Sequence, residues 1–486
     1  MGPIDALPEV SPRGWLGSFG SSMAQRLDLQ REIAAATAPM VRGRILHFPL
    51  VLPVRPEVCH EVLVSKARSF EKSPGLRVLL HDLGGQGLFT SEGELWRRQR
   101  KLMAPIFTPA ALGQFAETMR QTAERAADGM RPGQSLDLAH ETTRIAMTVV
   151  GSALFGIDAF DDADDLGAAL TTSLGWVGDK LASPGISAHV IAMDAARDLA
   201  RRTRGRVRDM FERLRQTFEA PLLIGGSRSP ELRHALKVLD ARIQELIDER
   251  RRGGLERPDL LTRLLLARDA ETETETTMTD TQIRDEVVTL FVAGHETTAT
   301  SLAWSLYLLS RHPDVLRRVV AEADAFGDGP IEQFEPERLA LTTRVFREAL
   351  RLYPPLMMLP RRTLEEVEIG GTTLPPRTLV LVSAYAQHRR ADVWEDPDRF
   401  DPDRFLPERE ATRPKGSYLP FGAGPRVCIG MHFAMMEGPI VLATLLRRFR
   451  FELDTTRTII EDDFATLRPK GGVPAVVRAR ERPGAQ

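Results

Sequence analysis

Only one of the two cysteines in the chain, Cys428, has surroundings that suit chemistry. It lies in the decapeptide Phe421-Gly-Ala-Gly-Pro-Arg-Val-Cys-Ile-Gly430, whose glycines allow tight turns and a close approach to another body. A helical pattern over Met431–Arg448 follows at once, and free N–H groups at a helix N-terminus favour a thiolate. Arg426 adds a positive charge two residues earlier. For an isolated cysteine, the better interpretation is still a buried structural residue in a glycine turn.

A second set of reactive side chains interrupts a long apolar helix, which the spacing of apolar residues predicts over Ile283–Ser310. Mid-way along it stands Phe291-Val-Ala-Gly-His-Glu-Thr-Thr-Ala299. A glycine, an acid and two hydroxyls oppose the local helical propensity there, which often marks a functional site. His295-Glu296 begins a zinc-protease motif, but Ala299 occupies the position of its second histidine. We therefore expect His295 to be packed and not to bind a metal.

Two further pairs place charged or aromatic side chains on one helix face. Trp96 and Arg100 lie four apart within the predicted helix Glu94–Met103, where an exposed basic helix is the simpler interpretation. Glu348 and Arg351 lie three apart, and a solvated ion pair is the simple alternative there. Their apolar neighbours favour burial, and a buried ion pair needs hydrogen bonds to its remaining groups.

The elements that must position these residues are mostly helices, so the sequence predicts a mainly α fold with a small β portion. Strand-like stretches are few: Ile45–Val54, Val367–Ser383 around Gly370-Gly371, and a weaker pair flanking Gly471-Gly472. Pairing between such distant strands favours one domain over residues 1–486.

Composition excludes several classes of protein. The chain has 486 residues, 42% apolar and 27% charged, which excludes wholesale disorder. Its net charge of −2 gives no global electrostatic case for nucleic acid or an acidic membrane as partner. No stretch reaches the roughly 18 uninterrupted apolar residues of a membrane span, and the first thirty residues lack the pattern of a signal peptide. Two cysteines exclude a disulfide framework, so we expect a cytoplasmic protein.

The cysteine loop resembles the haem-ligand signature of the cytochrome P450 family, Phe-x-x-Gly-x-Arg-x-Cys-x-Gly. All five fixed positions match, and they are Phe421, Gly424, Arg426, Cys428 and Gly430. The resemblance implies the P450 fold, with haem b (iron protoporphyrin IX) between the long central helix and the helix after the cysteine loop. It also implies that Cys428 is the axial ligand of the haem iron and that Arg426 pairs with a haem propionate.

The interrupted helix resembles the family's oxygen-activation motif, Ala/Gly-Gly-x-Asp/Glu-Thr-Thr. On this resemblance, Ala293 and Gly294 make room beside the haem. Thr297 forms a hydrogen bond to dioxygen, and Glu296 relays protons with water, since proton delivery to a buried oxygen needs a positioned chain.

The family also uses a Trp-x-x-x-Arg pair to hold a haem propionate, which the resemblance implies for Trp96 and Arg100. A further propionate-binding arginine often follows the Glu-x-x-Arg motif by ten residues. Arg361 occupies that position, and Arg362 is its neighbouring competitor.

Glu348 and Arg351 match that Glu-x-x-Arg motif itself. In the family a later Pro-x-x-Phe-x-Pro-x-Arg-Phe segment completes the pair with an arginine, here Arg404. The resemblance implies a structural role for these three residues in supporting the cysteine loop.

A hydrophobic substrate pocket is expected from the apolar residues at the family's pocket positions. These are Phe89, Leu290, Ala293, Leu356, Met357, Met358, Phe464 and Ala465. Their character suits a terpenoid, fatty acid or polyketide, although Met and Leu at such spacing more often mean core. The stretch Leu174–Gly226 is expected to carry lid helices.

The resemblance thus predicts a bacterial-type haem-thiolate monooxygenase that inserts one atom of dioxygen into a hydrophobic small molecule. Electrons would come from NAD(P)H through a ferredoxin- or flavodoxin-type partner with its reductase. The chain length fits a single haem domain over residues 1–486, with residues 1–40 as an N-terminal extension and no fused reductase.

Three alternatives stay open. A peroxide-driven oxygenase or an isomerase could use the same fold, but such members commonly lose the acid–alcohol pair that Glu296 and Thr297 form. A haem-binding sensor would bind the cofactor without turnover. A haem-free cysteine hydrolase is the most remote, because no histidine motif supports Cys428 as a nucleophile.

Overall fold

The computed structural model describes residues 3–11, 18, 22–45, 48–156, 163–180, 183–221, 224, 229–253, 259–266, 278–454, 457–463 and 466–480. The helices are α1 (Met23–Ala35), α2 (Pro56–His60), α3 (Pro74–Gly84), α4 (Gly93–Met103), α5 (Pro109–Leu112), α6 (Ala116–Asp128), α7 (Leu138–Phe155), α8 (Ala163–Lys180), α9 (Pro184–Arg202), α10 (Gly205–Thr217), α11 (Pro230–Gly253), α12 (Leu260–Leu266), α13 (Asp280–Arg311), α14 (Pro313–Phe326), α15 (Ala340–Leu352), α16 (Ala384–Gln387), α17 (Pro407–Glu410) and α18 (Met431–Arg448). The strands are β1 (Met40–Ile45), β2 (Phe48–Pro53), β3 (Phe70–Lys72), β4 (Ser135–Asp137), β5 (Met358–Thr363), β6 (Val367–Ile369), β7 (Thr372–Leu374), β8 (Leu379–Ser383), β9 (Phe449–Leu453), β10 (Glu461–Asp463), β11 (Leu467–Pro469) and β12 (Pro474–Ala479).

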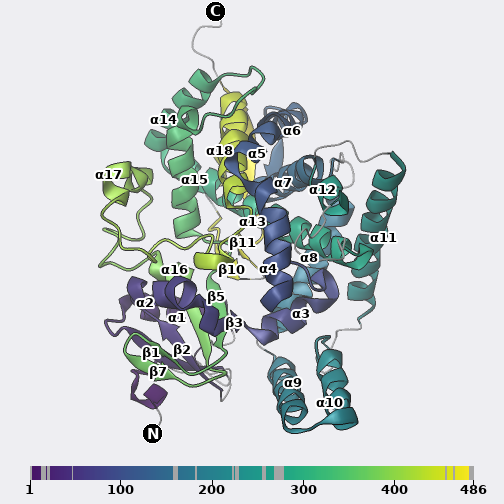
Figure 1. The fold of residues 1–486 in the computed structure, drawn as a ribbon. Helices are drawn as coiled ribbons and strands as arrows, with labels where there is room; N and C mark the ends of the chain where they lie inside the picture. Colours follow the sequence, from purple (N-terminus) through teal and green to yellow (C-terminus); the bar gives the residue numbers. More distant parts are fainter. Residues whose placement is uncertain are drawn as a thin grey trace, which may run out of the picture.

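The long helix α13 runs through the centre of the molecule, and the helix predicted over Ile283–Ser310 is confirmed. It begins with a capping box, in which Thr279 and Gln282 each accept a hydrogen bond from the other's backbone N–H. α7 packs along it, and α15 and α18 contact it as well (Figure 1). Buried side chains of these four helices belong to the same hydrophobic core, which fixes α13 between the helices that carry the predicted motifs.

The β portion lies mainly to one side of these helices (Figure 1). Its largest sheet has the strand order β1-β2-β8-β5-β3, in which β2 and β8 are parallel and the other pairs antiparallel. The prediction for Val367–Ser383 is confirmed by β6, β7 and β8. The prediction for Ile45–Val54 was incomplete, because the hairpin of β1 and β2 already begins at Met40.

The two strands beside Gly471-Gly472 exist, but they do not pair with each other. β11 pairs with β10, and β12 pairs with β4 and β9. The glycine turn therefore predicted the positions of both strands correctly. It did not predict their pairing partners, which lie elsewhere in the chain.

α9 and α10 form a helical hairpin at the end of the molecule, within the stretch where lid helices were predicted (Figure 1). α10 packs chiefly on α9, and α9 packs on α3. The second cysteine, Cys59, is fully buried in a cluster beside the large sheet, which agrees with a packing role.

Candidate active site

The cysteine loop closes tightly in front of α18. Gly424 has a φ of 70°, and a Cβ atom there would stand 2.0 Å from the carbonyl oxygen of Leu63, so only glycine fits. The Cys428 N–H donates to the Phe421 carbonyl at 2.9 Å. Because α18 begins at Met431, the predicted place of Cys428 just before a helix is confirmed.

Cys428 is exposed, although many protein atoms lie around its thiol. Burial raises the pKa of this thiol, while the N–H of Gly430 and the charge of Arg100 lower it in part. That the N-terminus of α18 favours a thiolate at Cys428 stays a prediction. A coordinated metal ion deprotonates a thiol outright, so ligation would change this balance.

A cluster of cations lies on the cysteine loop and around Glu92. Arg426 forms an ion pair with Glu92 and donates to the Ser91 carbonyl at 3.1 Å. Burial, reinforced by Arg361 and other cations nearby, lowers the pKa of Arg426 to about 10, against the opposing effect of Glu92. Burial and then Arg426 likewise depress the pKa of Lys72 well below its usual range. Positive charge thus exceeds negative charge here, which suits a ligand with carboxylates.

Arg361 is a partly buried cation of this cluster without a carboxylate partner among the described residues. Its guanidinium donates only to the Pro360 carbonyl at 3.0 Å, and burial lowers its pKa. Its neighbour Arg362 is fully engaged with Glu71 at 2.6 Å and Asp194 at 2.8 Å. Successive residues of a strand point to opposite faces, so β5 separates the two arginines, and only Arg361 is free to bind a ligand.

Trp96 and Arg100 both meet the cysteine loop from α4. The Arg426 guanidinium stacks on the Trp96 ring, 3.6 Å from its centroid, and Arg100 Nη1 donates to the Val427 carbonyl at 2.8 Å. Trp96, Arg100 and Arg426 lie together as the sequence predicts, whereas Lys72 and Glu92 were not predicted to join them. Neither Lys72 nor Glu92 is part of a recognisable motif, because no residue near either one in the sequence forms a functional pattern with it.

The middle of α13 presents an acid and an alcohol on adjacent positions. Thr297 Oγ1 donates to the Ala293 carbonyl at 2.7 Å. Glu296 Oε1 accepts from Thr466 Oγ1 at 2.9 Å, while its buried Oε2 has no hydrogen-bond partner among the residues described. His295 is buried, with its Nδ1 2.8 Å from the Phe291 carbonyl, and the prediction that it is packed is confirmed.

The two small residues before this pair differ in their surroundings. Ala293 is exposed, although Phe291 and His295, two residues away on each side, are buried. A Cβ at Gly294 would stand 2.8 Å from Val150 Cγ2, so the missing side chain lets α13 approach α7. Glycine is needed at position 294 for the packing of α13 on α7. Of the two residues, only Ala293 therefore faces open space beside α13.

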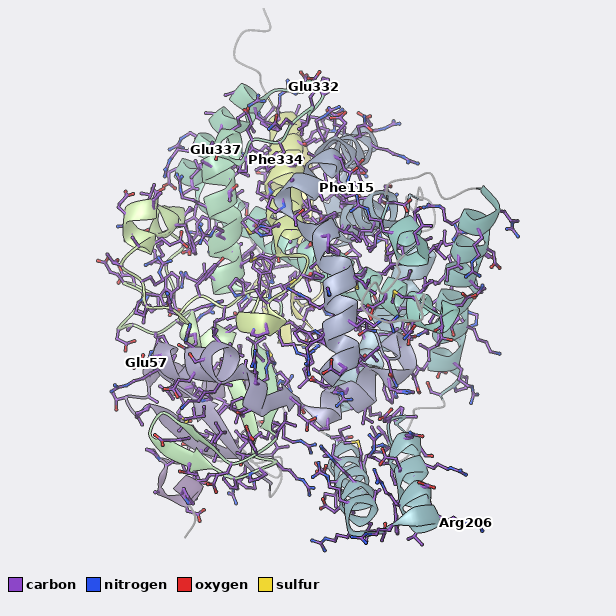
Figure 2. The ribbon with its side chains drawn as sticks, viewed as in Figure 1. Glu57, Phe115, Arg206, Glu332, Phe334 and Glu337 are labelled. Carbon is purple, nitrogen blue, oxygen red and sulfur yellow. The ribbon has the colours of Figure 1, made fainter. Side chains whose placement is uncertain are left out.

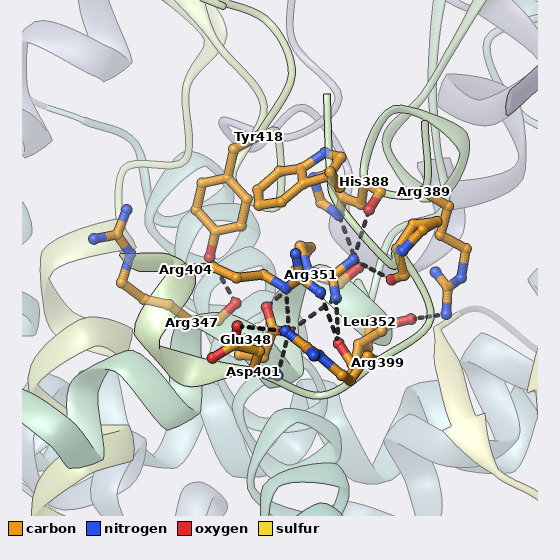
Figure 3. A network of polar contacts seen from close by, with 12 residues as sticks. Arg347, Glu348, Arg351, Leu352, His388, Arg389, Arg399, Asp401, Arg404 and Tyr418 are labelled. Carbon is orange, nitrogen blue, oxygen red and sulfur yellow. Dashed lines mark hydrogen bonds and ion pairs between the residues drawn. The ribbon is translucent and has the colours of Figure 1, made fainter. Parts of the chain in front are cut away.

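A buried ion pair supports the cysteine loop from α15 (Figure 3). Arg351 donates to both carboxylate oxygens of Glu348, at 2.7 and 2.8 Å, and neither side chain has exposed surface. Arg404 stands 3.4 Å from Glu348 Oε1, and the Asp401 N–H donates to the same oxygen at 2.9 Å. The predicted triad is therefore assembled, and these hydrogen bonds offset the cost of burying the charges.

His388 connects that network to the cysteine loop. Its Nε2 accepts from the Leu419 N–H at 2.8 Å, so its Nδ1 carries the proton that is donated to the Arg351 carbonyl at 3.1 Å. Burial and the positive charge of Arg351 hold the pKa of His388 well below its usual range, so the ring stays neutral. One imidazole thus joins α15 to the segment that leads into Phe421.

The predicted pocket residues are spread over several surroundings. Phe89 is partly buried beside Lys72, whose Nζ lies 5.1 Å from its ring centroid, and Leu290 is buried in the main core. Met357 packs in a separate small cluster, and Met358 Sδ accepts from Gln30 at 3.5 Å. The remaining members are Leu356, which is partly buried, and Phe464 and Ala465, which lie outside the described residues.

A cavity of about 530 Å³ lies beside the small cluster that contains Met357, because Tyr353 and Tyr385 belong to both. Its lining comes from α1, the C-terminal ends of α13 and α15, the segment 385–400 and Glu461. No predicted site residue among those that the structure describes contributes to it.

The cytochrome P450 family model matches residues 8–474 of the chain, which is nearly its whole length. The chain belongs to the cytochrome P450 family. Among relatives of this P450, cyclooctatin synthase of Streptomyces melanosporofaciens is 34% identical over 85% of the chain and 83% of its own length. Pentalenene oxygenase of Streptomyces avermitilis is 31% identical over 89% of the chain and 88% of its own length.

A solved structure supports the fold. The crystal structure of the cytochrome P450DA haem domain superposes with a TM-score of 0.78, at 24% identity, over 98% of each chain. Relatives named as oxygenases, together with the family match, make this chain a P450 monooxygenase that uses haem and dioxygen. Among the described residues, no helix is long and apolar enough to cross a membrane.

The residues on and around the cysteine loop fit the haem that the family implies. A thiol stands before α18, and the unpaired Arg361 lies with Lys72 and Arg426 in a site where positive charge is in excess. Haem carries two propionates, and carboxylates are the groups that would offset the desolvation of these cations.

Proposed function

We propose that this P450 oxidises a terpenoid-type hydrocarbon, with electrons from NAD(P)H delivered by a ferredoxin- or flavodoxin-type partner and its reductase. The relatives named for cyclooctatin and pentalenene support this substrate class. The apolar character of the candidate pocket residues supports it as well. Fatty acids and polyketides remain the other members of the predicted class.

Five side chains of this chain hold the cofactor in the proposed site. Cys428 ligates the iron, while Arg426 and Arg361 bind the propionates, and Trp96 keeps the Arg426 guanidinium in place through the stack described above. Arg100 fixes the loop through the Val427 carbonyl. The bound haem supplies the dioxygen activation that no amino-acid side chain can provide.

Proton delivery is the task of Glu296 and Thr297. The observation that carries the proposal is the Oε2 of Glu296, which has no hydrogen-bond partner among the described residues. Thr466 holds Oε1, so Oε2 is the atom left to take a proton from water and pass it on. The Thr297 hydroxyl proton is engaged on the Ala293 carbonyl, so its oxygen acts as an acceptor. The hydrogen bond to dioxygen that the resemblance implies would need this proton to turn away from Ala293 first. An isomerase or a peroxide-driven enzyme would have no use for this arrangement.

An electron donor would dock beside α4. Arg97 and Lys101 are exposed on this helix, whose other residues Trp96 and Arg100 contact the cysteine loop. An acidic partner protein would be attracted to these charges and brought close to Cys428.

Two measurements test the proposal. The carbon monoxide difference spectrum of the reduced protein should show the red-shifted Soret band of a thiolate ligand, and Cys428→Ser should abolish it. With NADPH, a ferredoxin and its reductase, Thr297→Ala should still consume NADPH but convert more of it to peroxide than to product. Product formation from peroxide alone at the rate of the complete system would favour the peroxide-driven alternative, and binding without turnover would favour the sensor.

The substrate class is tested separately by spectral titration. Cyclic terpene hydrocarbons, fatty acids and macrolide-type polyketides are added in turn, and displacement of water from the haem is followed at the Soret band. Tightest binding of a terpene is expected, whereas a clear preference for a fatty acid would refute the terpenoid assignment and leave the monooxygenase intact.

A further inference from the structure

The backbone of Leu467 in β11 is held on both sides by the helical body. Its carbonyl accepts a hydrogen bond from the indole N–H of Trp304 on α13 at 2.9 Å. Its own N–H donates to the carbonyl of Pro355, beyond the end of α15, at 2.9 Å. Leu467 has no exposed surface, so water does not readily replace either bond. β11 is therefore fixed against α13, which it also contacts directly (Figure 1).

The residue before Leu467 is the one that holds Glu296. Thr466 is 5% exposed, and its Oγ1 donates to Glu296 Oε1 at 2.9 Å. The branched Cβ of threonine restricts its χ1 angle, so the position of this hydroxyl follows the backbone. A contact that fixes the backbone at Leu467 therefore also fixes the hydrogen bond to Glu296.

Trp304 reaches this strand from about two helical turns beyond Glu296 on α13. The eight residues between them cover about 12 Å of helix. Side chains of a helix tilt toward its N-terminus, so the indole is directed back along α13 toward the acid. Thr466 and Leu467 thus connect Trp304 with Glu296 through two neighbouring residues of one strand. Trp304 and Leu467 are 163 residues apart, so no local sequence pattern predicts this connection.

Two tyrosine rings hold the indole of Trp304 in place. The Tyr353 ring stacks on it, with the centroids 3.9 Å apart and the planes at 7°. The Tyr307 ring meets it edge-on at 5.5 Å and 78°. Trp304 is 1% exposed, and α13 lies well inside the periphery on which Figure 2 labels Glu57 and Arg206. Stacked and edge-on contacts are the preferred arrangements of aromatic rings, so the direction of the N–H is fixed as well.

A second buried tryptophan shows what core packing alone would give. A buried indole N–H needs an acceptor in any case. Trp394 is also 1% exposed, and its N–H donates to the Gln387 carbonyl at 3.0 Å. That acceptor lies in α16, which carries no residue assigned to proton delivery. Of the two indoles, Trp304 is the one whose acceptor adjoins the residue that binds Glu296.

We propose that Trp304, held by Tyr353, is a positioning residue for proton delivery, an inference that rests on the proposed role of Glu296. The indole fixes β11, so that Thr466 keeps Oε1 of Glu296 engaged and Oε2 stays available for the proton. Without the indole N–H, β11 shifts and the carboxylate leaves the orientation that transfers a proton. NADPH, a proton and dioxygen then yield NADP⁺ and hydrogen peroxide, and no oxygen atom enters the substrate.

Hydrogen–deuterium exchange of the haem-containing protein tests the first step without substrate or electron donor. Trp304→Phe removes the indole N–H and keeps an aromatic ring against Tyr353, and Trp394→Phe is the matched control. The Leu467 N–H should exchange about fivefold faster in Trp304→Phe, which is the factor expected for the loss of one neutral hydrogen bond. In Trp394→Phe it should exchange at the wild-type rate, because that indole does not contact β11.

The ratio of hydrogen peroxide to product tests the second step, per haem, with NADPH, a ferredoxin, its reductase and the compound that binds most tightly in the spectral titration. Trp304→Phe should raise this ratio about fivefold, in the direction of Thr466→Val, and Trp394→Phe should leave it unchanged. Trp304→Phe added to Thr466→Val should raise the ratio no further, because the indole acts through that threonine. Tyr353→Leu should give a smaller rise and Tyr353→Phe none, because only the leucine loses the stack.

Three results would overturn the proposal. The first is a wild-type exchange rate at Leu467 in Trp304→Phe, and the second is a peroxide ratio that this variant leaves unchanged or that Trp394→Phe raises equally. The third is a further rise in the double variant, because Trp304 would then act independently of Thr466. A wild-type protein that forms no product from any compound would refute the proposed function alone, and the exchange rates of the two indole variants would then decide whether Trp304 fixes β11.

Discussion

Replacing Glu286 by glutamine should change how the stability of this P450 depends on pH. Glu286 is fully buried on α13, and its Oε2 accepts from the Leu88 N–H at 2.9 Å. Its Oε1 has no partner among the residues that the structure describes. Burial, with a smaller contribution from Asp285, raises the pKa of this carboxyl to about 7, while the Leu88 N–H and Lys72 act in the opposite direction.

The sign and size of the effect follow from the pKa. The folded protein holds this proton more tightly than the unfolded chain, whose Glu has a pKa of 4.5. The free energy of unfolding therefore falls as pH rises above that value, and the decrease is complete above about pH 7. At about 1.4 kcal/mol per pKa unit the total is about 3 kcal/mol, of which about 2 kcal/mol accrues between pH 5.5 and 8.

Glu286→Gln removes the titration and keeps an oxygen that can accept from Leu88. Relative to wild type, its free energy of unfolding should increase by about 2 kcal/mol between pH 5.5 and pH 8. Urea unfolding of both proteins at the two pH values measures this difference, in which every other titrating group cancels. Glu57→Gln, at an exposed position, should show no such change. A difference between Glu286→Gln and wild type that stays constant with pH would refute the reasoning.

Three further changes have expected outcomes. Gly424→Ala forces a side chain against a backbone carbonyl and should abolish haem incorporation, which is read from the Soret absorbance. As a control, the new side chain of Gly371→Ala meets no atom within 4 Å, so this variant should lower the free energy of unfolding by only about 1 kcal/mol. Glu348→Gln leaves its buried arginine partner without a counter-charge and should lower the free energy of unfolding by about 3–5 kcal/mol in urea, and a loss below about 1 kcal/mol would contradict the buried network. Thr466→Val frees the second oxygen of Glu296, so product formed per NADPH should fall in the reconstituted system, and unchanged coupling would argue that Thr466 does not position the acid.

The fold and the candidate site were predicted best where the same short segment determines both the local structure and the functional residues. The cysteine loop, α18 and the centre of α13 were placed correctly because glycine spacing, helix periodicity and motif spacing agree there. The cation cluster was only half found, since Lys72 and Glu92 come from segments with no pattern of their own. Their roles depend on distances between β3, α4 and the cysteine loop, which only the tertiary fold sets.

Gly294 and the strands around Gly471-Gly472 show a related limit. A glycine inside a helix can make room for a cofactor or for a neighbouring helix, and only the contact with Val150 shows that α7 is its neighbour. A glycine turn between two strands favours a hairpin, yet β12 pairs with β4 and β9. Strand pairing depends on cross-strand packing more than on local preference.

The arginine beside Cys428 is evidence for an anionic ligand in a way that an exposed arginine is not. Arg361 is partly buried, and a buried cation without a counter-charge costs free energy, so its presence indicates an anionic ligand. Water solvates an exposed arginine at no such cost, so a missing carboxylate beside one carries no such meaning.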